Sequence, residues 1–361
     1  MEGEATALVT IEELLQILVD QGGSDLHISA GSPPKVRVDG HLYNTEHQVL
    51  MPEATKKLIY SFLTGDQIAR FENDLELDLS FGVEGLGRFR VNVFLQRGSV
   101  AAVLRMIPSQ VRGFDELGLP RAICEQVSGL PRGLVLVCGA TGSGKSTTLA
   151  AMLDYINETR SDHVLTVEDP IEFLHRNKGC LFNQREIGSD TKGFSSALRS
   201  ALREDPDIVL VGEMRDMETI EAALTIAETG HLTFGTLHTS DCVQAINRIV
   251  DVFPSHQQQQ IRTQLSFTLQ AVMCQQLIPT AQGSGRALAL EIMIANSAVR
   301  ALVRDDKAHQ IYSIIQTNGK LGMQTMNQAL GDLVQRNMIT YEQAMNHSAD
   351  LEDLQRTLAR L

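Results

Sequence analysis

The sequence predicts an α/β protein with two domains. A small α+β domain over residues 1–106 is joined by a flexible linker over 107–120 to a larger domain with a mostly parallel sheet over 121–361. Apolar and polar residues alternate along the first third of the chain, as in strands with one solvated face. Beyond residue 133, short wholly apolar segments alternate with helix-prone segments, which is typical of a parallel sheet covered by helices. A length of 361 residues, 43% of them hydrophobic, is enough for two cores.

The first domain is expected to begin with an amphipathic helix. Thr10 precedes a run with apolar residues at helical spacing, and Glu13 follows three residues later, which is the pattern of a capped helix start. Strands are expected where short apolar segments lie between turn formers such as Asp39-Gly40. The expected elements are a helix at 11–19, strands at 25–28 and 36–38, a helix at 53–62, and strands at 77–83 and 89–95.

Two arginines share one face of the last of these strands. Since strand side chains alternate with a period of two, Arg88 and Arg90 point away from the face that carries Phe89 and Val91. The sequence therefore predicts two guanidinium groups on one polar face of the first domain.

The second domain follows a stretch rich in turn formers, where we place the linker. After residue 257 the spacing of apolar residues favours a helix that continues to residue 277, followed by shorter helices up to the C-terminus. The strands of this domain are expected at 134–138, 163–167, 208–211 and 232–237.

Composition excludes several classes of protein. No apolar run reaches the ~18–20 residues that span a bilayer, and the acidic start does not resemble an export signal, so we expect a cytoplasmic protein. The five cysteines form no Cys-x-x-Cys pair, which argues against a disulfide framework and against zinc. A net charge of −13 disfavours nucleic acid as a partner.

A phosphate-binding loop follows the first apolar strand of the second domain. The segment from Gly139 to Ser146 matches G-x-x-x-x-G-K-[ST] and precedes a helix-prone stretch, as the motif requires. In such loops backbone N–H groups surround the phosphates, so we expect Lys145 to reach the β and γ phosphates of ATP and the Ser146 hydroxyl to ligate Mg²⁺. The predicted nucleotide-binding residues are Gly139, Ala140, Thr141, Gly142, Ser143, Gly144, Lys145, Ser146 and Thr147.

Carboxylates follow two other predicted strands. Glu213 ends the strand at 208–211, where side chains reach the ligand crevice, and is the favoured general base; the alternative is a surface carboxylate. Many P-loop enzymes carry a metal-binding Asp just before this position, but here it is Gly212. We therefore expect Glu168, Asp169 and Glu172 to ligate Mg²⁺, although such acids also occur in solvated loops.

Two histidines bracket the strand at 232–237. His231 and His238 could sense a γ-phosphate, and the alternative is that both are structural. The strand separates them by roughly 23 Å, which is too far for one metal ion.

Taken together, these motifs resemble the ATPases of type II secretion and type IV pili, most closely the retraction ATPases of twitching motility. Further matching segments are 23–27 and 87–92 in the first domain, so the resemblance covers nearly the whole chain. It implies a PAS-like first domain, a RecA-like second domain, and a hexameric ring with ATP at the subunit junctions. It also implies that Lys145 and Ser146 hold the phosphates and Mg²⁺, that Glu213 is catalytic, and that acids of 168–172 act on metal and water. Arg88, Arg90 or Arg105 would reach the nucleotide as an arginine finger or sensor.

The direction of the motor rests on two features. Assembly ATPases of this family usually carry a tetracysteine zinc site, which this chain lacks, so the resemblance implies pilus retraction. The retraction class has a motif Ala-Ile-Arg-Asn-Leu-Ile-Arg-Glu; residues 298–305 keep its arginines, Arg300 and Arg304, but lack its Asn and end in a shorter acid. Alternatively, these arginines line a solvated helix face.

The resemblance also implies partners and a location. A retraction motor would act on an inner-membrane platform protein at the cytoplasmic base of the pilus and would contact the membrane only through partners. An assembly or type II secretion motor, a DNA or conjugation motor, and a non-catalytic nucleotide-switched scaffold remain as alternatives.

Overall fold

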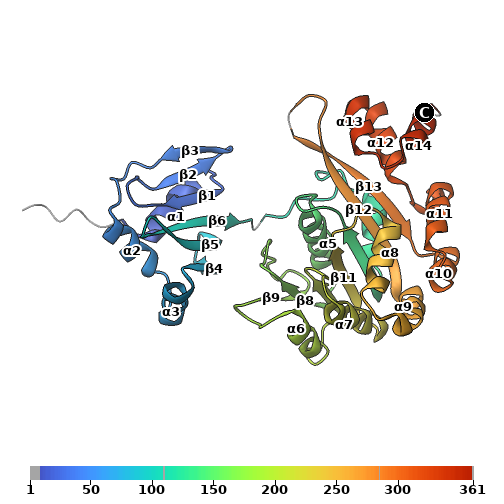
Figure 1. The fold of residues 1–361 in the computed structure, drawn as a ribbon, viewed down its shortest axis with the longest axis horizontal. Coiled ribbons are helices and arrows are strands. Elements are labelled where there is room, and N and C mark those ends of the chain that lie inside the picture. The colour runs from blue at the N-terminus through green and yellow to red at the C-terminus, as the bar shows by residue number, and fades with distance from the viewer. Residues whose placement is uncertain (1–8, 109, 284, 360–361) are drawn as a thin grey trace, which may run out of the picture. The chain divides into compact units, whose positions relative to one another are not determined.

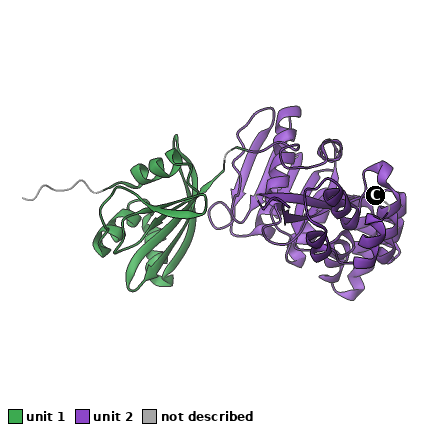
Figure 2. Ribbon diagram, turned by 90° about the horizontal axis from the view of Figure 1, so that it is seen from above, with its two compact units in different colours: residues 1–110 green, residues 111–361 purple. Residues whose placement is uncertain are grey.

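The computed structural model describes residues 9–108, 110–283 and 285–359. The chain divides into two compact units, residues 1–110 and residues 111–361 (Figure 2). Each unit has a hydrophobic core of its own. No helix in the described ranges is both long and apolar enough to cross a bilayer.

The first unit is an antiparallel sheet with the strand order β3-β2-β1-β6-β5-β4, packed against helices (Figure 1). Each neighbouring pair of strands runs antiparallel. The strands are β1 (Asp25–Ile28), β2 (Lys35–Val38), β3 (His41–Asn44), β4 (Glu76–Val83), β5 (Gly87–Gln96) and β6 (Ser99–Ile107). The helices are α1 (Ile11–Asp20), α2 (Pro52–Tyr60) and α3 (Gly65–Asp74).

Local sequence signals account for most of these elements. The Thr10 hydroxyl accepts a hydrogen bond from the Glu13 backbone N–H at 3.2 Å, which confirms the predicted helix start. The predicted alternation along β5 is also confirmed, because Phe89 and Val91 are fully buried and Arg90 is exposed. Helix α3 and strand β6 were not predicted from the sequence, although β6 lies at the centre of the sheet.

The second unit is built on a larger sheet with the order β13-β12-β7-β11-β10-β8-β9. The strands run parallel except β13, which is antiparallel to β12. All four predicted strands are present, and β9 was missed. The strands are β7 (Gly133–Cys138), β8 (His163–Glu168), β9 (Leu181–Glu186), β10 (Ile208–Val211), β11 (Leu232–Leu237), β12 (Leu269–Pro279) and β13 (Arg286–Ile294).

Helices cover both faces of this sheet (Figure 1). Along β7, Leu134 and Leu136 pack on the side of α6 to α11, whereas Val135 and Val137 pack on the side of α4 and α5. Burial of both faces explains why the strand is apolar throughout. The helices are α4 (Arg121–Ser128), α5 (Lys145–Thr159), α6 (Phe194–Ala201), α7 (Met217–Glu228), α8 (Cys242–Asp251), α9 (Ser255–Thr268), α10 (Ser297–Arg304), α11 (Ile311–Thr317), α12 (Met326–Gln335), α13 (Tyr341–His347) and α14 (Leu351–Leu358).

The helix expected to run from residue 257 to residue 277 is present only in its first part. Helix α9 ends at Thr268, and the chain then forms the strands β12 and β13. The last carbonyl groups of α9 bond to Arg300, a residue more than 30 positions away, with N···O distances of 2.8 Å for Ser266 and 3.0 Å for Phe267. A local pattern carries no information about such a distant partner. Because β12 is buried on both faces, its apolar spacing does not separate strand from helix.

Residues of the predicted linker also belong to a core. Phe114 and Leu119 are buried among residues of α4 and α5 in the second unit. A segment rich in turn formers can therefore still supply anchor residues.

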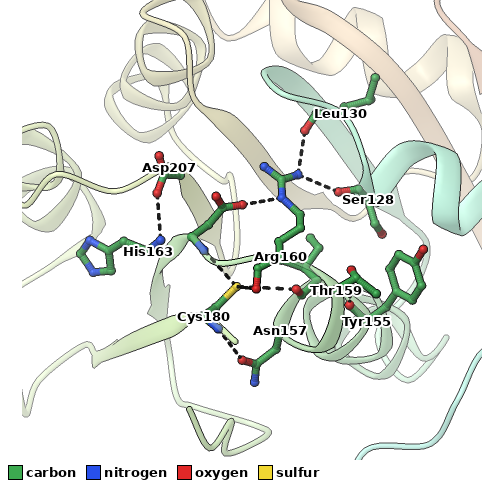
Figure 3. A network of polar contacts seen from close by, with 11 residues as sticks. Ser128, Leu130, Tyr155, Asn157, Thr159, Arg160, His163, Cys180 and Asp207 are labelled. Atoms are coloured by element: carbon green, nitrogen blue, oxygen red, sulfur yellow. Dashed lines mark hydrogen bonds and ion pairs between the residues drawn. The ribbon is translucent and has the colours of Figure 1, made fainter. Parts of the chain in front are cut away.

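A polar network fixes the end of α5 (Figure 3). Arg160 caps this helix and donates hydrogen bonds to the carbonyl oxygens of Ser128 and Leu130, both at 3.0 Å. The side-chain oxygen of Asn157 accepts from the backbone N–H of Cys180 at 3.3 Å, just before β9. Since α5 begins at the phosphate-binding loop, these contacts hold the helix that carries the loop.

Candidate nucleotide-binding site

The predicted loop lies between β7 and α5, as its motif requires. Its glycines adopt the left-handed backbone that favours glycine, with φ of +79° at Gly142 and +90° at Gly144. A Cβ on Gly139 would lie 2.5 Å from the carbonyl oxygen of Gln275, so the loop packs tightly on β12. Ala140, Thr141 and Gly142 form the exposed part of the loop, and α5 begins directly behind it. Backbone N–H groups at this helix start can bind an anion.

The Lys145 side chain lies along the loop. Its ammonium group donates to the carbonyl oxygens of Gly139 at 2.8 Å and Ala140 at 3.1 Å. Burial lowers the pKa of Lys145, while the nearby Glu213 acts in the opposite direction. A desolvated cation beside the loop is suited to bind phosphate oxygens.

The carboxyl ends of the parallel strands meet at the edge of the sheet where the loop lies. Strands β7, β11, β10 and β8 end there in register, so the residues that follow them lie close together. A pocket at this edge is lined by residues of α5 and by residues near or just beyond the ends of the strands. The lining residues are Ser146, Leu149, Ala150, Leu153, Glu168, Phe173, His175, Leu210, Gly212 and Thr236.

Glu213 is held by two basic side chains at this edge. One of its carboxylate oxygens lies 2.9 Å from Nε2 of His238 and also pairs with the Arg215 guanidinium. The Glu213 side chain is 20% exposed, so solvent still reaches it. The structure thus brings together Glu213 and His238, two of the residues expected to be catalytic.

The geometry explains why glycine precedes this glutamate. A Cβ on Gly212 would lie 3.0 Å from the Val167 carbonyl oxygen and 3.1 Å from Cα of Glu168. The Thr236 hydroxyl donates to the Gly212 carbonyl oxygen at 2.6 Å. Neighbouring strands therefore approach closely here, and this position has little room for the aspartate found in many P-loop enzymes.

The expected metal-binding acids differ in their surroundings. Glu168 lines the pocket with Ser146, accepts from the Thr166 hydroxyl at 2.6 Å, and has a pKa raised by burial. Asp169 and Glu172 are exposed, and the Glu172 backbone N–H donates to Glu168 at 3.4 Å. Oxygen donors of this kind suit Mg²⁺.

Other expected residues lie elsewhere. His231 precedes β11, at the amino-terminal end of the sheet, and its ring contacts the Ile226 carbonyl oxygen at 3.0 Å. The structure therefore does not bring His231 to the loop edge within one chain.

The three arginines belong to the first unit. Arg88 donates to the Ser80 hydroxyl at 2.6 Å, Arg105 pairs with the buried Asp25 at 2.8 Å, and Arg90 is exposed. Arg90 and Arg105 are direct partners in the pairing of β5 with β6, so they lie side by side.

Comparison with known proteins identifies the family. The family described as "Type II/IV secretion system protein" matches residues 1–346. The chain belongs to this family. It is 55% identical over 334 residues to "Type IV pilus retractation ATPase PilT" of Pseudomonas aeruginosa, covering 92% of this chain and 96% of that protein. It is 48% identical over 321 residues to "Twitching motility protein" of Neisseria gonorrhoeae, covering 89% and 86%. The solved structure titled "Crystal Structure of the Pilus Retraction Motor PilT and Bound ADP" has a TM-score of 0.90 at 50% identity and covers 96% of this chain and 99% of that chain.

Membership of the secretion-system family confirms the resemblance drawn from the motifs, and the mixed α/β fold agrees with it. The family motifs do not identify every residue that touches the loop. Gln275 on β12 is 2% exposed and bonds to the loop, yet it lies in the segment expected to be helical. Gln184 on the missed strand β9 donates to Glu168 at 3.3 Å. Neither belongs to a short motif, so only the correct strand assignment could have revealed them.

The five cysteines carry no disulfide and are all buried. Cys242, Cys274 and Glu291 gather so closely that one atom of each could ligate a metal. Glu291 already accepts the backbone N–H of Cys242 at 2.8 Å and that of Met326 at 3.3 Å, which caps the starts of α8 and α12. Burial raises the pKa of Cys242 to about 12, so its thiol stays protonated.

Proposed function

We propose that this protein is an ATP-hydrolysing motor that powers the retraction of type IV pili and thereby twitching motility. The observation that carries the proposal is the complete phosphate-binding loop facing the Glu213–His238 pair at one edge of the sheet. The similarity, over most of the chain, to one protein named for pilus retraction and to another named for twitching motility supports this direction of movement. An assembly or type II secretion motor is the alternative within the same family.

The chemistry follows from the positions of the side chains. The loop N–H groups and Lys145 bind the β and γ phosphates and stabilise the charge that develops on the transferred phosphoryl group. Glu213 accepts the proton of the attacking water, and the close contact with His238 orients its carboxylate. Ser146 and Glu168, with Asp169 and Glu172, would hold Mg²⁺, which supplies positive charge beside the phosphates when bound.

Assembly of the motor is part of the proposal. Six copies would form a ring with ATP at the junctions, and an arginine of one copy would reach the nucleotide held by its neighbour. Arg90 and Arg105 are both exposed, but Arg105 is bonded to Asp25 and Arg88 to Ser80, so Arg90 is the best candidate. We propose an inner-membrane platform protein as the partner, at the cytoplasmic base of the pilus.

An experiment in the native host separates retraction from assembly. Glu213→Ala should give cells with excess surface pili and no twitching, because pili form but are not withdrawn. Bald cells would show an assembly motor instead. Glu221→Ala, which changes an exposed carboxylate on α7, is the matched control and should leave pili and twitching unchanged.

The other classes predict different outcomes in solution. A DNA or conjugation motor would hydrolyse ATP faster when DNA is added, which the net charge of −13 disfavours. A nucleotide-switched scaffold would bind ATP without releasing phosphate.

A further inference from the structure

The Gln275 side chain joins two parts of the nucleotide-binding segment. It extends from β12, which pairs with β7 so that Cys274 lies opposite Cys138, the last residue before the loop. Its amide nitrogen donates to the Ser143 carbonyl oxygen at 2.6 Å, and its amide oxygen accepts from the Thr148 hydroxyl at 3.0 Å. One side chain thus bonds to both the loop and the first turns of α5.

The first of these bonds fixes the orientation of one peptide group. In the trans peptide that joins Ser143 to Gly144, the C=O and the N–H point in opposite directions. Because Gln275 holds the C=O towards β12, the Gly144 N–H points away from β12. Gly144 is the N-cap of α5, where N–H groups that face a phosphate stabilise it.

The opposite orientation would harm phosphate binding. Gly144 has a φ of +90° and no side chain, so its own conformation does little to prevent rotation of this peptide. A rotated peptide would present its carbonyl oxygen to the phosphate, and the partial negative charge of that oxygen would repel the phosphate anion. We propose that Gln275 is a positioning residue that locks the Ser143–Gly144 peptide in the orientation that binds phosphate.

The chemistry of the site suits an amide. The Ser143 carbonyl oxygen needs a donor and the Thr148 hydroxyl needs an acceptor, and the amide of a glutamine offers both on two separate atoms. Gln275 is 2% exposed and Thr148 is 3% exposed, so water does not readily replace either bond. A glutamate here could still accept from Thr148, but its carboxylate would face the Ser143 oxygen without a hydrogen to donate.

The inference rests on the nucleotide-binding role proposed above and predicts weaker binding more than slower chemistry. For Gln275→Ala and Gln275→Glu we expect the KM for ATP to rise at least tenfold while kcat falls less than threefold. Thr148→Val removes the bond from the Thr148 hydroxyl to Gln275 and should raise KM less than either Gln275 variant does. Thr148→Ser keeps the hydroxyl and should have the KM of the wild type. A fluorescent ADP analogue measures binding directly and should show the same order of dissociation constants.

Gln276→Ala is the matched control. Gln276 is the next residue on β12, but its side chain contacts His347 at 3.0 Å rather than the loop. If Gln275→Glu, which is nearly isosteric, melts like the wild type and binds the ADP analogue within twofold of Gln276→Ala, the proposal is overturned. The analogue also separates the positioning role of Gln275 from the proposed motor function. Wild-type protein that binds the analogue without hydrolysing ATP would contradict only the motor function.

Discussion

Arg300 offers the sharpest test of how the second unit is held together. Its guanidinium donates to the carbonyl oxygens of Ser266 and Phe267 at 2.8 and 3.0 Å, and to the side chain of Gln270 at 3.0 Å. The last carbonyl groups of a helix have no partner inside it, and a cation near that end also offsets the helix dipole. Arg300 therefore caps the end of α9 and connects α10 to the start of β12, so the alternative that it lines a solvated face does not hold for Arg300.

The structure gives a rough magnitude for Arg300→Ala. Hydrogen bonds from a charged donor contribute about 1.5–3 kcal/mol each, but the Phe267 carbonyl is exposed and can bond to water in the variant. We expect a loss of about 2–4 kcal/mol in the free energy of unfolding, measured by urea denaturation followed by circular dichroism.

Arg304→Ala is the control for this measurement. Arg304 lies one turn further along α10, has a side chain that is 47% exposed, and pairs with Asp305 at 3.4 Å. We expect a change below about 1 kcal/mol, as for surface ion pairs. Equal effects of the two substitutions would refute the capping role and restore the solvated-face interpretation.

Three further predictions concern the loop edge. Burial lowers the pKa of His175 to about 4, so between about pH 6.5 and pH 4 the unfolded chain binds a proton that the folded chain does not, and stability falls on acidification. In urea titrations at several pH values, His175→Phe should reduce the slope of the free energy of unfolding against pH by up to about 1.4 kcal/mol per pH unit. Equal slopes for the variant and the wild type would contradict this. Lys145→Ala should weaken binding of a fluorescent ADP analogue at least 100-fold, and tight binding would exclude its phosphate role. Gly212→Ala should destabilise the protein by about 1–3 kcal/mol in thermal melts, because its Cβ would press on the Val167 carbonyl; an unchanged melting temperature would disprove that close approach.

The sequence predicted those parts of the site that depend on local patterns. The loop from Gly139 to Ser146 and the strand before Glu213 were found because a motif and an apolar run each form within a few residues. The pairing of Glu213 with His238 depends on strand order, since β10 and β11 are neighbours only in the folded sheet.

The parts that were missed depend on distant contacts. Strand β12 was predicted as a helix because the apolar residues of a strand buried on both faces do not alternate with polar ones. The contact of Gln275 with the loop was therefore not predicted either. His231 was predicted to act with His238 because both flank β11. Only the carboxyl end of β11, where His238 follows, lies beside the loop. Arg300 caps the end of α9, which lies more than 30 residues earlier in the chain, so its role was not visible in the local sequence.

The central claim is that ATP bound by this loop is split by water that Glu213 activates. The most direct measurement is the release of inorganic phosphate from ATP by purified wild-type protein and by Glu213→Ala, with magnesium present. Loss of a general base lowers rates by about 10²–10⁴-fold, so the variant should lose at least 99% of turnover while still binding the ADP analogue. Turnover that survives this substitution, or wild-type protein that releases no phosphate, would contradict the account.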